Sequence, residues 1–444
     1  MPRISIPLPV TCDYDTYSAR RTGLTNMRHI THQGGAVEVI PSPGLVTGAT
    51  VAAAAARHIT SAANHAVVVA GANAYKYNGT TLTSIGAIDA GTTSISALSV
   101  DTGTHLVIVD PYINTCCGIA LPALAAVTTI TPPGGISFAA VAYQDGYTIY
   151  AREGSDEFYI SALDDPTTIG ALDFSTADAL PGNIVGIISD HRELVIFKEL
   201  SIEFWINTGN ASFPFERSQP GVAELGCLSA RTIAKSGNVI YFLGSDNRVH
   251  RLRGYQPEPV SNDYIASQVY SSMGGSVYDS GRRQYYHIGL TAQMSLHMDL
   301  ETGAWHKRVS SDYDYYVGFV SLTLSGGSRQ TYALVKDGTS ALVCNYASYA
   351  RSDTSSSSAR IVQFTLPDTV RGMILKEIAI RADINSGAPT LTIGAAIVSM
   401  SATRAGRYHA WRRLGRRGNE LVAIVLPADT DSLSEIVIDF EPLE

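Results

Sequence analysis

Residues 145–161 read DGYTIYAREGSDEFYIS, in which a turn precedes two short apolar strands. Similar stretches follow at 190–206, DHRELVIFKELSIEFWI, and at 236–253, SGNVIYFLGSDNRVHRLR. The turns recur every 43 to 46 residues, at 102–103, 145–146, 190–191, 236–237, 280–281 and 326–327, with a fainter one at 63–64. Three or four short strands per repeat of this length are typical of β-propeller blades, which bury their faces only against neighbouring blades.

These repeats predict an all-β chain whose N-terminal β-propeller covers residues 45–350. Seven blades fit in this range, and six is the alternative if the faint repeat is not a blade. Two stacked sandwiches of irregular hairpins are a further alternative, because no blade-specific tag repeats. Residues 1–44 are interpreted as an N-terminal arm, in which residues 36–40 complete the last blade, since ring closure removes an exposed strand edge. The alanine-rich residues 52–56 are predicted to form a strand.

A change in composition divides the chain after the propeller. Residues 351–359, RSDTSSSSA, are too polar to bury apolar area and are predicted to be a linker. Residues 360–444 contain further short strands separated by clear turns. This pattern indicates a small C-terminal β-sandwich-like domain.

The composition limits the classes of partner. Only 16% of the residues are charged, against about 25% in typical proteins, whereas 45% are hydrophobic. The formal net charge of -8 argues against binding nucleic acid or an anionic membrane through the overall field. Pro7 and Pro9 interrupt the apolar run of the N-terminus, and no stretch approaches the ~20 apolar residues that span a bilayer. We therefore expect assembly in the cytoplasm and no membrane partner.

Catalytic and metal-binding motifs are missing from the sequence. It contains no phosphate-binding loop, dinucleotide fingerprint, zinc-protease motif or nucleophile elbow. The five cysteines match no zinc pattern and are expected to be free thiols. His29 and His32 have no third ligand candidate nearby and are interpreted as surface histidines. The sequence therefore predicts no enzyme, catalytic residue, metal or cofactor.

Five carboxylates are the strongest candidates for acid–base chemistry, because β-propellers often host glycosidases that use a pair of carboxyl groups. They are Asp156, Glu157, Asp164, Asp165 and Asp173. The run Asp164-Asp165-Pro166 is typical of a turn, and the sequence box of sialidase-type propellers does not recur. A propeller that binds or hydrolyses glycans is the alternative function.

An arginine-rich segment is the strongest local anomaly of this acidic chain. Residues 403–418 read TRAGRYHAWRRLGRRG and hold six of the 32 Lys and Arg residues. Guanidinium groups bind carboxylate or phosphate in bidentate fashion and stack on aromatic rings. The segment predicts a docking surface for an acidic partner or for nucleic acid, and a solvated hairpin is the alternative. The partner-binding candidates are Arg404, Arg407, Trp411, Arg412, Arg413, Arg416 and Arg417.

Nine segments, in this order and spacing, carry a family resemblance that spans nearly the whole chain. They are 40–44 (IPSPG), 75–79 (YKYNG), 156–165 (DEFYISALDD), 182–188 (GNIVGII), 194–197 (LVIF), 201–205 (SIEFW), 208–209 (TG), 213–215 (FPF) and 408–417 (YHAWRRLGRR). With them the chain resembles the packaged-DNA stabilisation proteins, or tail hub proteins, of short-tailed bacteriophages (podoviruses). The segments are structural rather than catalytic motifs.

This resemblance implies a component of the virion tail that assembles as a homo-oligomeric ring of six copies. It implies attachment to the head-to-tail adaptor protein ring below the portal, closure of the DNA channel after packaging, and attachment of the tail needle or tailspikes. Passive contact with DNA in the channel is also implied. A charge-poor surface rich in Ser, Thr and Tyr suits the broad interfaces of such a part. Tyr313, Tyr315 and Tyr316 are candidates for an interface or for edge-strand packing.

Overall fold

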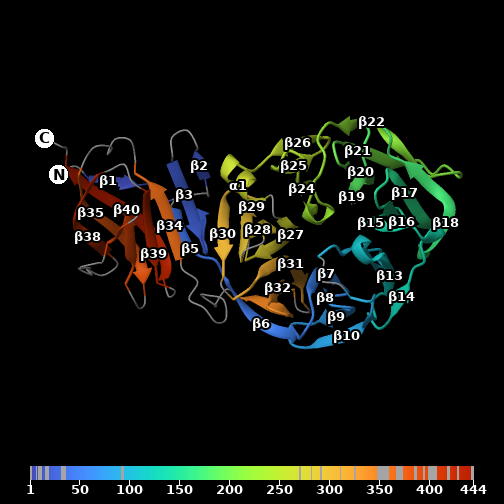
Figure 1. The fold of residues 1–444 in the computed structure, drawn as a ribbon, viewed down its shortest axis with the longest axis horizontal. Helices are drawn as coiled ribbons and strands as arrows, with labels where there is room; N and C mark the ends of the chain where they lie inside the picture. The colour runs from blue at the N-terminus through green and yellow to red at the C-terminus, as the bar shows by residue number, and fades with distance from the viewer. Residues whose placement is uncertain are drawn as a thin grey trace.

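The computed structural model is almost entirely β-structure and has two parts that lie side by side (Figure 1). The larger part is a seven-bladed β-propeller, and the smaller part is a β-sandwich. Among the residues that the structure describes, no helix is long and apolar enough to cross a membrane. The structure describes residues 3–6, 8, 13–15, 20–31, 37–91, 95–269, 272–281, 283–290, 293–310, 312–324, 327–347, 360–366, 374–384, 388–393, 396–398, 408–417, 421–427 and 430–441.

Each blade is an antiparallel sheet of four strands, and the first strands of neighbouring blades pack together around the axis. Blade 1 comprises β7 (Ala56–Ala62), β8 (His65–Ala70), β9 (Asn73–Tyr77) and β10 (Leu82–Ala87). Blade 2 comprises β11 (Leu98–Asp101), β12 (His105–Asp110), β13 (Thr115–Ala120) and β14 (Val127–Thr129). Blade 3 comprises β15 (Phe138–Gln144), β16 (Tyr147–Arg152), β17 (Glu157–Ala162) and β18 (Asp165–Thr176). Blade 4 comprises β19 (Ile184–Asp190), β20 (Glu193–Lys198), β21 (Ile202–Asn207) and β22 (Phe215–Ala223).

The remaining three blades complete the ring. Blade 5 comprises β23 (Ala234–Ser236), β24 (Val239–Leu243), β25 (Val249–Arg253) and β26 (Gln256–Pro259). Blade 6 comprises β27 (Ser272–Ser280), β28 (Arg283–Leu290), β29 (Met294–Asp299) and β30 (Trp305–Val309). Blade 7 comprises β31 (Tyr315–Thr323), β32 (Arg329–Asp337), β33 (Ser340–Ala347) and β6 (Gly44–Val51). The described helical elements are α1 (Asp263–Gln268), η1 (Pro111–Ile113), η2 (Pro133–Gly135) and η3 (Ala230–Thr232).

The predicted turns connect the first and second strands of the seven blades. Asp145 and Gly146 have φ angles of 51° and 87°, in the left-handed region that favours short polar residues and glycine. The faint signal is a turn of the same kind, with Asn64 at φ 60°. The seven-bladed propeller expected from the repeat is therefore confirmed, and the six-bladed and stacked-sandwich alternatives are wrong.

The strand that closes the ring is not the one expected. Residues 36–40 were expected to complete blade 7, but β5 (Val37–Pro41) pairs with strands of the sandwich. Blade 7 is completed by β6, which pairs with β33 from Gly44 opposite Ala347 to Val51 opposite Ala341. Pro41 and Pro43 lack backbone N–H groups, so they interrupt the ladder and separate the two strands. Residues 52–55 form a turn with Ala53 at φ 52°, not the expected strand, and β7 begins at Ala56.

The sandwich contains strands from both ends of the chain, so residues 1–44 are not an arm separate from the C-terminal domain. One sheet has the order β38-β35-β40-β5-β4 with β1 on β40, and the other continues from blade 6 through β3-β34-β39-β36-β37, with β2 on β3. Leu24, Met27 and Val39 pack in one core with Ile378 and Ile424. The expected linker 351–359 lies outside the described residues. The strands are β1 (Arg3–Ile6), β2 (Asp13–Asp15), β3 (Arg20–Thr25), β4 (Met27–Thr31), β34 (Arg360–Thr365), β35 (Ile374–Ile384), β36 (Thr390–Ile393), β37 (Ala396–Val398), β38 (Tyr408–Arg417), β39 (Leu421–Leu426) and β40 (Thr430–Glu441).

Asn26 joins the sandwich to blade 6. Its side-chain amide accepts from Val309 N at 2.8 Å and donates to Val309 O at 2.9 Å, so it pairs with β30 as another strand would. Its own N–H donates to Lys307 O at 2.8 Å. Arg308 is buried and donates from Nη1 to Pro43 O at 2.7 Å, directly before β6. The same short region therefore holds the sandwich, blade 6 and the closing strand together.

Buried charged groups connect neighbouring blades. Arg57 of blade 1 is fully buried and forms ion pairs with Asp89, at 2.9 Å, and with Asp110 at the end of β12 in blade 2. In blade 4, buried Lys198 lies 3.6 Å from Glu203 and also donates from Nζ to Ala177 O and Leu180 O, in the segment that leads from blade 3 into blade 4. Such pairs offset the cost of removing charge from water only when both partners are present. Their geometry therefore helps to fix which surfaces of neighbouring blades meet.

Three histidines form a ladder across blade 6, because His287 is the register partner of His297 and His297 that of His306. Their ring centroids are 5.1 and 5.2 Å apart. Burial, together with nearby Arg308, lowers the pKa of His287 to about 3, and burial with Arg28 and Arg308 does the same for His306. Burial lowers the pKa of His297 well below its usual value, with further lowering by its histidine neighbours and Arg308. All three imidazoles are therefore neutral in the folded protein at pH 7.

Leu45→Ala tests ring closure by β6. Leu45 is fully buried between blades 6 and 7, so we expect the free energy of unfolding to fall by about 2–5 kcal/mol. The matched control is Leu172→Ala, which alters a side chain that is 87% exposed. This control should change the free energy of unfolding by less than about 0.5 kcal/mol. Urea unfolding followed by tryptophan fluorescence measures both. Equal effects of the two variants would contradict the packing of β6 in blade 7.

The histidine ladder predicts acid sensitivity. The unfolded chain binds protons at these histidines below pH ~6.5, whereas the folded protein does not until about pH 3, so stability is full above pH 6.5 and falls as the pH decreases. At pH 5, each neutral buried histidine should lower the free energy of unfolding by about 2 kcal/mol relative to its value above pH 6.5. In His297→Gln, the thermal midpoint should depend less on pH between 7.5 and 5, whereas exposed His191→Gln should behave as the wild type. Parallel curves for the wild type and His297→Gln would disprove the role of the ladder.

Candidate functional site

The arginine-rich segment lies at the edge of the sandwich. Arg412, Arg413, Arg416 and Arg417 are in β38, whose partner among the described strands is β35. Arg412 is the register partner of Glu377 in β35. Arg404 and Arg407 lie outside the described residues. The segment is therefore the outer strand of the sheet farthest from the propeller (Figure 1).

Trp411 is not part of a docking surface. Its side chain is 1% exposed and packs in the sandwich core with Ile378, its register partner in β35. The sequence suggested that its ring could stack with arginines at a surface, but in β38 the aromatic ring contributes to the apolar face that the sheet buries. The prediction for Trp411 is therefore wrong, because burial of a large aromatic side chain stabilises the sandwich instead.

The five candidate carboxylates are spread over β17, β18 and the turn between them, with Asp156 directly before β17 and Asp173 in β18. Glu157 is at the start of β17 and is 2.5 Å from Arg152, whereas Asp164 and Asp165 follow the end of this strand. From Glu157 to Ala162, β17 spans five steps of ~3.3 Å, or about 17 Å, and Asp164 lies in the turn beyond its end, so Glu157 and Asp164 are farther apart than the ~5–9.5 Å between glycosidase carboxyl groups. Asp165 accepts from Thr167 N at 2.9 Å, and hydrogen bonds with Thr167 and Thr168 lower its pKa. A turn is present, but at residues 163–164 with Asp164 at φ 57°, and Asp165 and Pro166 already begin β18.

The remaining polar candidates also lie apart. Cys116, Cys117, Cys227 and Cys344 are buried and form no disulfide, which confirms the expected thiols among the described residues. Burial raises the pKa of Cys117 and Cys227 to about 12. The ring of His29 and all of His32 and Cys12 lie outside the described structure. No group of three His, Cys, Asp or Glu residues in the described part of the chain could hold a metal ion. Tyr313 and Tyr316 are buried and pack together, so the packing interpretation holds for them.

An acidic surface with exposed apolar side chains covers the opposite end of the molecule from the sandwich. The large apolar side chains that are exposed, among the described residues, all lie between Tyr112 and Tyr255. The most exposed is Leu172 in β18, where the register with β17 shifts. Residues 138–227, which include blades 3 and 4, hold 14 Asp and Glu but four Lys and Arg. In Figure 1, β18 and β22 mark this end and β38 marks the other.

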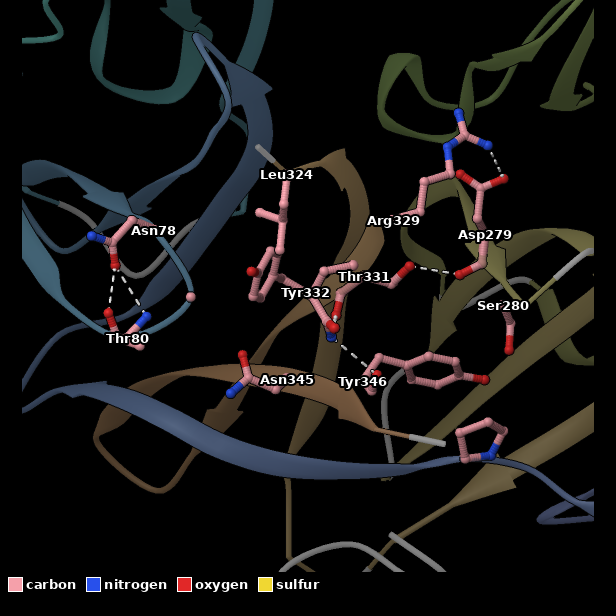
Figure 2. Close-up of a pocket in the computed structure, with 14 residues that line it drawn as sticks. Asn78, Thr80, Asp279, Ser280, Leu324, Arg329, Thr331, Tyr332, Asn345 and Tyr346 are labelled. Carbon is pink, nitrogen blue, oxygen red and sulfur yellow. Dashed lines mark hydrogen bonds and ion pairs between the residues drawn. The ribbon is translucent and has the colours of Figure 1, made fainter. Parts of the chain in front are cut away.

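A polar cleft of about 630 Å³ lies between blades 1, 6 and 7 (Figure 2). Asn78, Thr331, Tyr332 and Asn345 line it with amide and hydroxyl groups. Arg329 at its side forms an ion pair with Asp279 at 2.9 Å, and Thr331 Oγ1 donates to Asp279 O at 2.6 Å. The cleft therefore offers hydrogen bonds to uncharged polar groups, and its one guanidinium is already paired.

Neither the acidic surface nor the polar cleft was expected from the sequence. A local count of acidic residues over 138–227 would have indicated the acidic surface. The cleft is formed by segments that are far apart in the chain, around Asn78, Asp279 and Tyr332. No sequence pattern links such segments before the order of the blades is known.

Comparisons with known proteins agree with this architecture. A family model described as "Bacteriophage P22 Gp10, beta-propeller" matches residues 25–273, more than half of the chain. No curated protein matches the chain.

Solved structures that align with two thirds or more of the chain share little sequence with it. The computationally designed Ika8 protein has 9% identity and a TM-score of 0.44, over 68% of this chain and 100% of that one. A chain of the mitotic checkpoint complex has 10% identity and a TM-score of 0.43, over 68% and 94%. BamB from Moraxella catarrhalis has 9% identity and a TM-score of 0.40, over 78% and 96%. The match to the family model rests instead on sequence and includes blades 1 to 5 entirely, so the chain belongs to the bacteriophage P22 Gp10 β-propeller family of phage structural proteins.

Proposed function

We propose that the chain is the tail hub of a short-tailed phage virion. In this proposal it attaches below the portal to the adaptor ring, helps to close the DNA channel after packaging, and holds the tail needle or tailspikes. The observation that carries the proposal is the match of residues 25–273 to the P22 Gp10 family. The separation of Glu157 from Asp164 further supports a structural role rather than glycan hydrolysis by this pair.

The distribution of charge supports assembly as a ring. Copies in a closed ring meet through two different surfaces of each chain. Here β38, with four arginines, lies at one end of the molecule, and the acidic surface of blades 3 and 4 lies at the other (Figure 1). Opposite charges at the two ends favour contact between unlike ends and disfavour contact between like ends.

The mass of the assembled protein tests the ring. Six copies of the 47.3 kDa chain would give a particle of about 280 kDa in native mass spectrometry. Because a ring can require a template, the measurement is made both on the purified chain and on the chain bound to adaptor-bearing phage heads. A stoichiometry other than six per head would contradict the hexameric hub.

Replacing the four β38 arginines tests the docking role of this strand. The combined change of Arg412, Arg413, Arg416 and Arg417 to Ser should reduce attachment to adaptor-bearing heads by at least tenfold at low salt. Wild-type attachment should weaken as salt increases, because exposed charges are screened over ~8 Å at physiological ionic strength. Sedimentation of heads with labelled hub protein measures attachment between 50 and 500 mM NaCl.

A matched variant controls for the loss of charge alone. It changes Arg192, Arg248, Arg251 and Arg253, on blades 4 and 5, to Ser and removes the same formal charge. This variant should attach as the wild type does. Circular dichroism confirms that both variants fold, and wild-type attachment by the β38 variant would show that its arginines only face solvent. Salt-dependent binding of free duplex DNA that the β38 changes abolish would instead indicate nucleic acid as the partner.

A further inference from the structure

Two adjoining cavities lie on the axis of the propeller. The smaller cavity has a volume of about 150 Å³ and is lined by inner strands of blades 1, 2, 6 and 7 together with Arg231 of η3 in blade 5. The larger has a volume of about 380 Å³, and both are lined by Thr60, Leu98 and Ser99. Apolar and polar residues both line the larger cavity, Asp101 among them, whereas the smaller one contains the guanidinium group of Arg231.

Arg231 extends from blade 5 to the chain that enters blade 2. Its Nη1 donates to Ile95 O at 2.5 Å, three residues before β11. A guanidinium group has five N–H donors. Among the described residues, this is the single hydrogen bond of the Arg231 side chain, and no carboxylate lies within ion-pair distance of it. Most of its donors therefore have no protein acceptor.

Asp110, the acidic group that attracts Arg231, is already paired with other groups. Asp110 attracts the charge of Arg231, but its Oδ2 forms the ion pair with Arg57, and its Oδ1 accepts from Ser96 and from Tyr112 N. The residues that line the smaller cavity include no Asp or Glu. The positive charge at the axis is therefore not neutralised by a carboxylate of the chain itself.

Electrostatics in the cavity agree with this geometry. Burial lowers the pKa of Arg231 to about 9, and the attraction of Asp110 and Tyr315 offsets only part of this effect. Burial and repulsion by Arg231 and Arg57 lower the pKa of His58 to about 3, so its imidazole is neutral. An unpaired charge in a desolvated site is costly. An anion in the cavity would remove this cost.

The surrounding backbone leaves room for the guanidinium group. A Cβ atom on Gly274 would lie 3.1 Å from Arg231 Nη2, and Gly274 has a φ of 144°, which other residues rarely adopt. Ser99 and Ser276 add hydroxyl groups to the wall. The cavity volume of about 150 Å³ is several times what one water molecule needs. It therefore has room for a carboxylate group or a phosphate ion.

We propose that the axial cavity binds a small oxyanion, a carboxylate or phosphate group, through the N–H groups of Arg231. Arginine presents parallel N–H donors that match both groups, and such charge-assisted hydrogen bonds are strong. The bound anion contacts a ring position where five blades meet. It therefore stabilises the closed propeller in addition to neutralising Arg231.

Titration of the full-length protein with sodium phosphate or sodium acetate, against sodium chloride of equal ionic strength, tests the site. The thermal midpoint of the wild type should rise saturably with the oxyanion that binds, and calorimetry at 25 °C should give the same dissociation constant. Saturation with phosphate alone identifies a phosphate site, and saturation with acetate identifies a carboxylate site. A wild type that shows no saturable response to either anion overturns the proposal.

Two variants connect the response to Arg231. Arg231→Met should raise the dissociation constant by at least about tenfold, because it removes the charged donors. Arg231→Lys keeps the charge but loses the paired donors, so it should bind with intermediate affinity and provides the comparison if the methionine variant does not fold. Exposed Arg192→Met is the matched control and should bind as the wild type. The assignment of the site would be overturned if folded Arg231→Met and Arg231→Lys both bound the oxyanion with the affinity of the wild type.

Discussion

The pairing of β6 with β33 is the constraint on which the rest of the structure depends. A propeller blade buries its faces only between two neighbours, so an open array leaves two blades half exposed. Here the closing strand comes from about 300 residues earlier in the chain than the strand it joins. Closing such a long loop costs conformational entropy before any contact is gained. Ring closure therefore gives its full stabilisation only when all seven blades are in place.

The sandwich reduces the difficulty of this closure. Its strands come from both chain ends, β1 and β3–β5 from one and β34–β40 from the other. The two segments that must meet in blade 7 are consequently tethered to one folded body. Asn26 and Arg308 then hold the entry to β6 next to blade 6. The sandwich is thus both an additional domain and the device that brings the propeller ends together.

The local repeat could be predicted from sequence because each turn needs particular residues. Asn64, Asp145 and Gly237 have positive φ, a conformation that depends on the residue itself and its neighbours. The role of residues 1–44 could not be predicted in this way. Pairing of β1 with β40 joins Arg3 to Asp439, and no local pattern encodes a partner at that distance.

For the candidate site as well, the sequence showed local patterns but not which distant segments meet. The arginines of β38 were visible as a run of charge, and the burial of Trp411 follows from which face of that strand meets the core. Alternation alone does not tell which face is buried when the neighbouring sheet is unknown. Arg231 has no distinguishing neighbours in sequence, and its place on the axis follows from the arrangement of five blades.

Two arginines inside the propeller, Arg57 and Arg231, have different binding partners. Arg57 is paired with Asp89 and Asp110, so the chain itself supplies the carboxylates that a purely structural cation needs. Arg231 lies at the axis, is only partly buried, and is held by a backbone carbonyl, with no Asp or Glu in the wall of its cavity. With a pKa of about 9, the guanidinium group of Arg231 keeps its charge at pH 7. A fold that neutralises one guanidinium with two carboxylates and leaves the other facing a cavity has therefore placed a positive charge where a group from outside the chain can reach it.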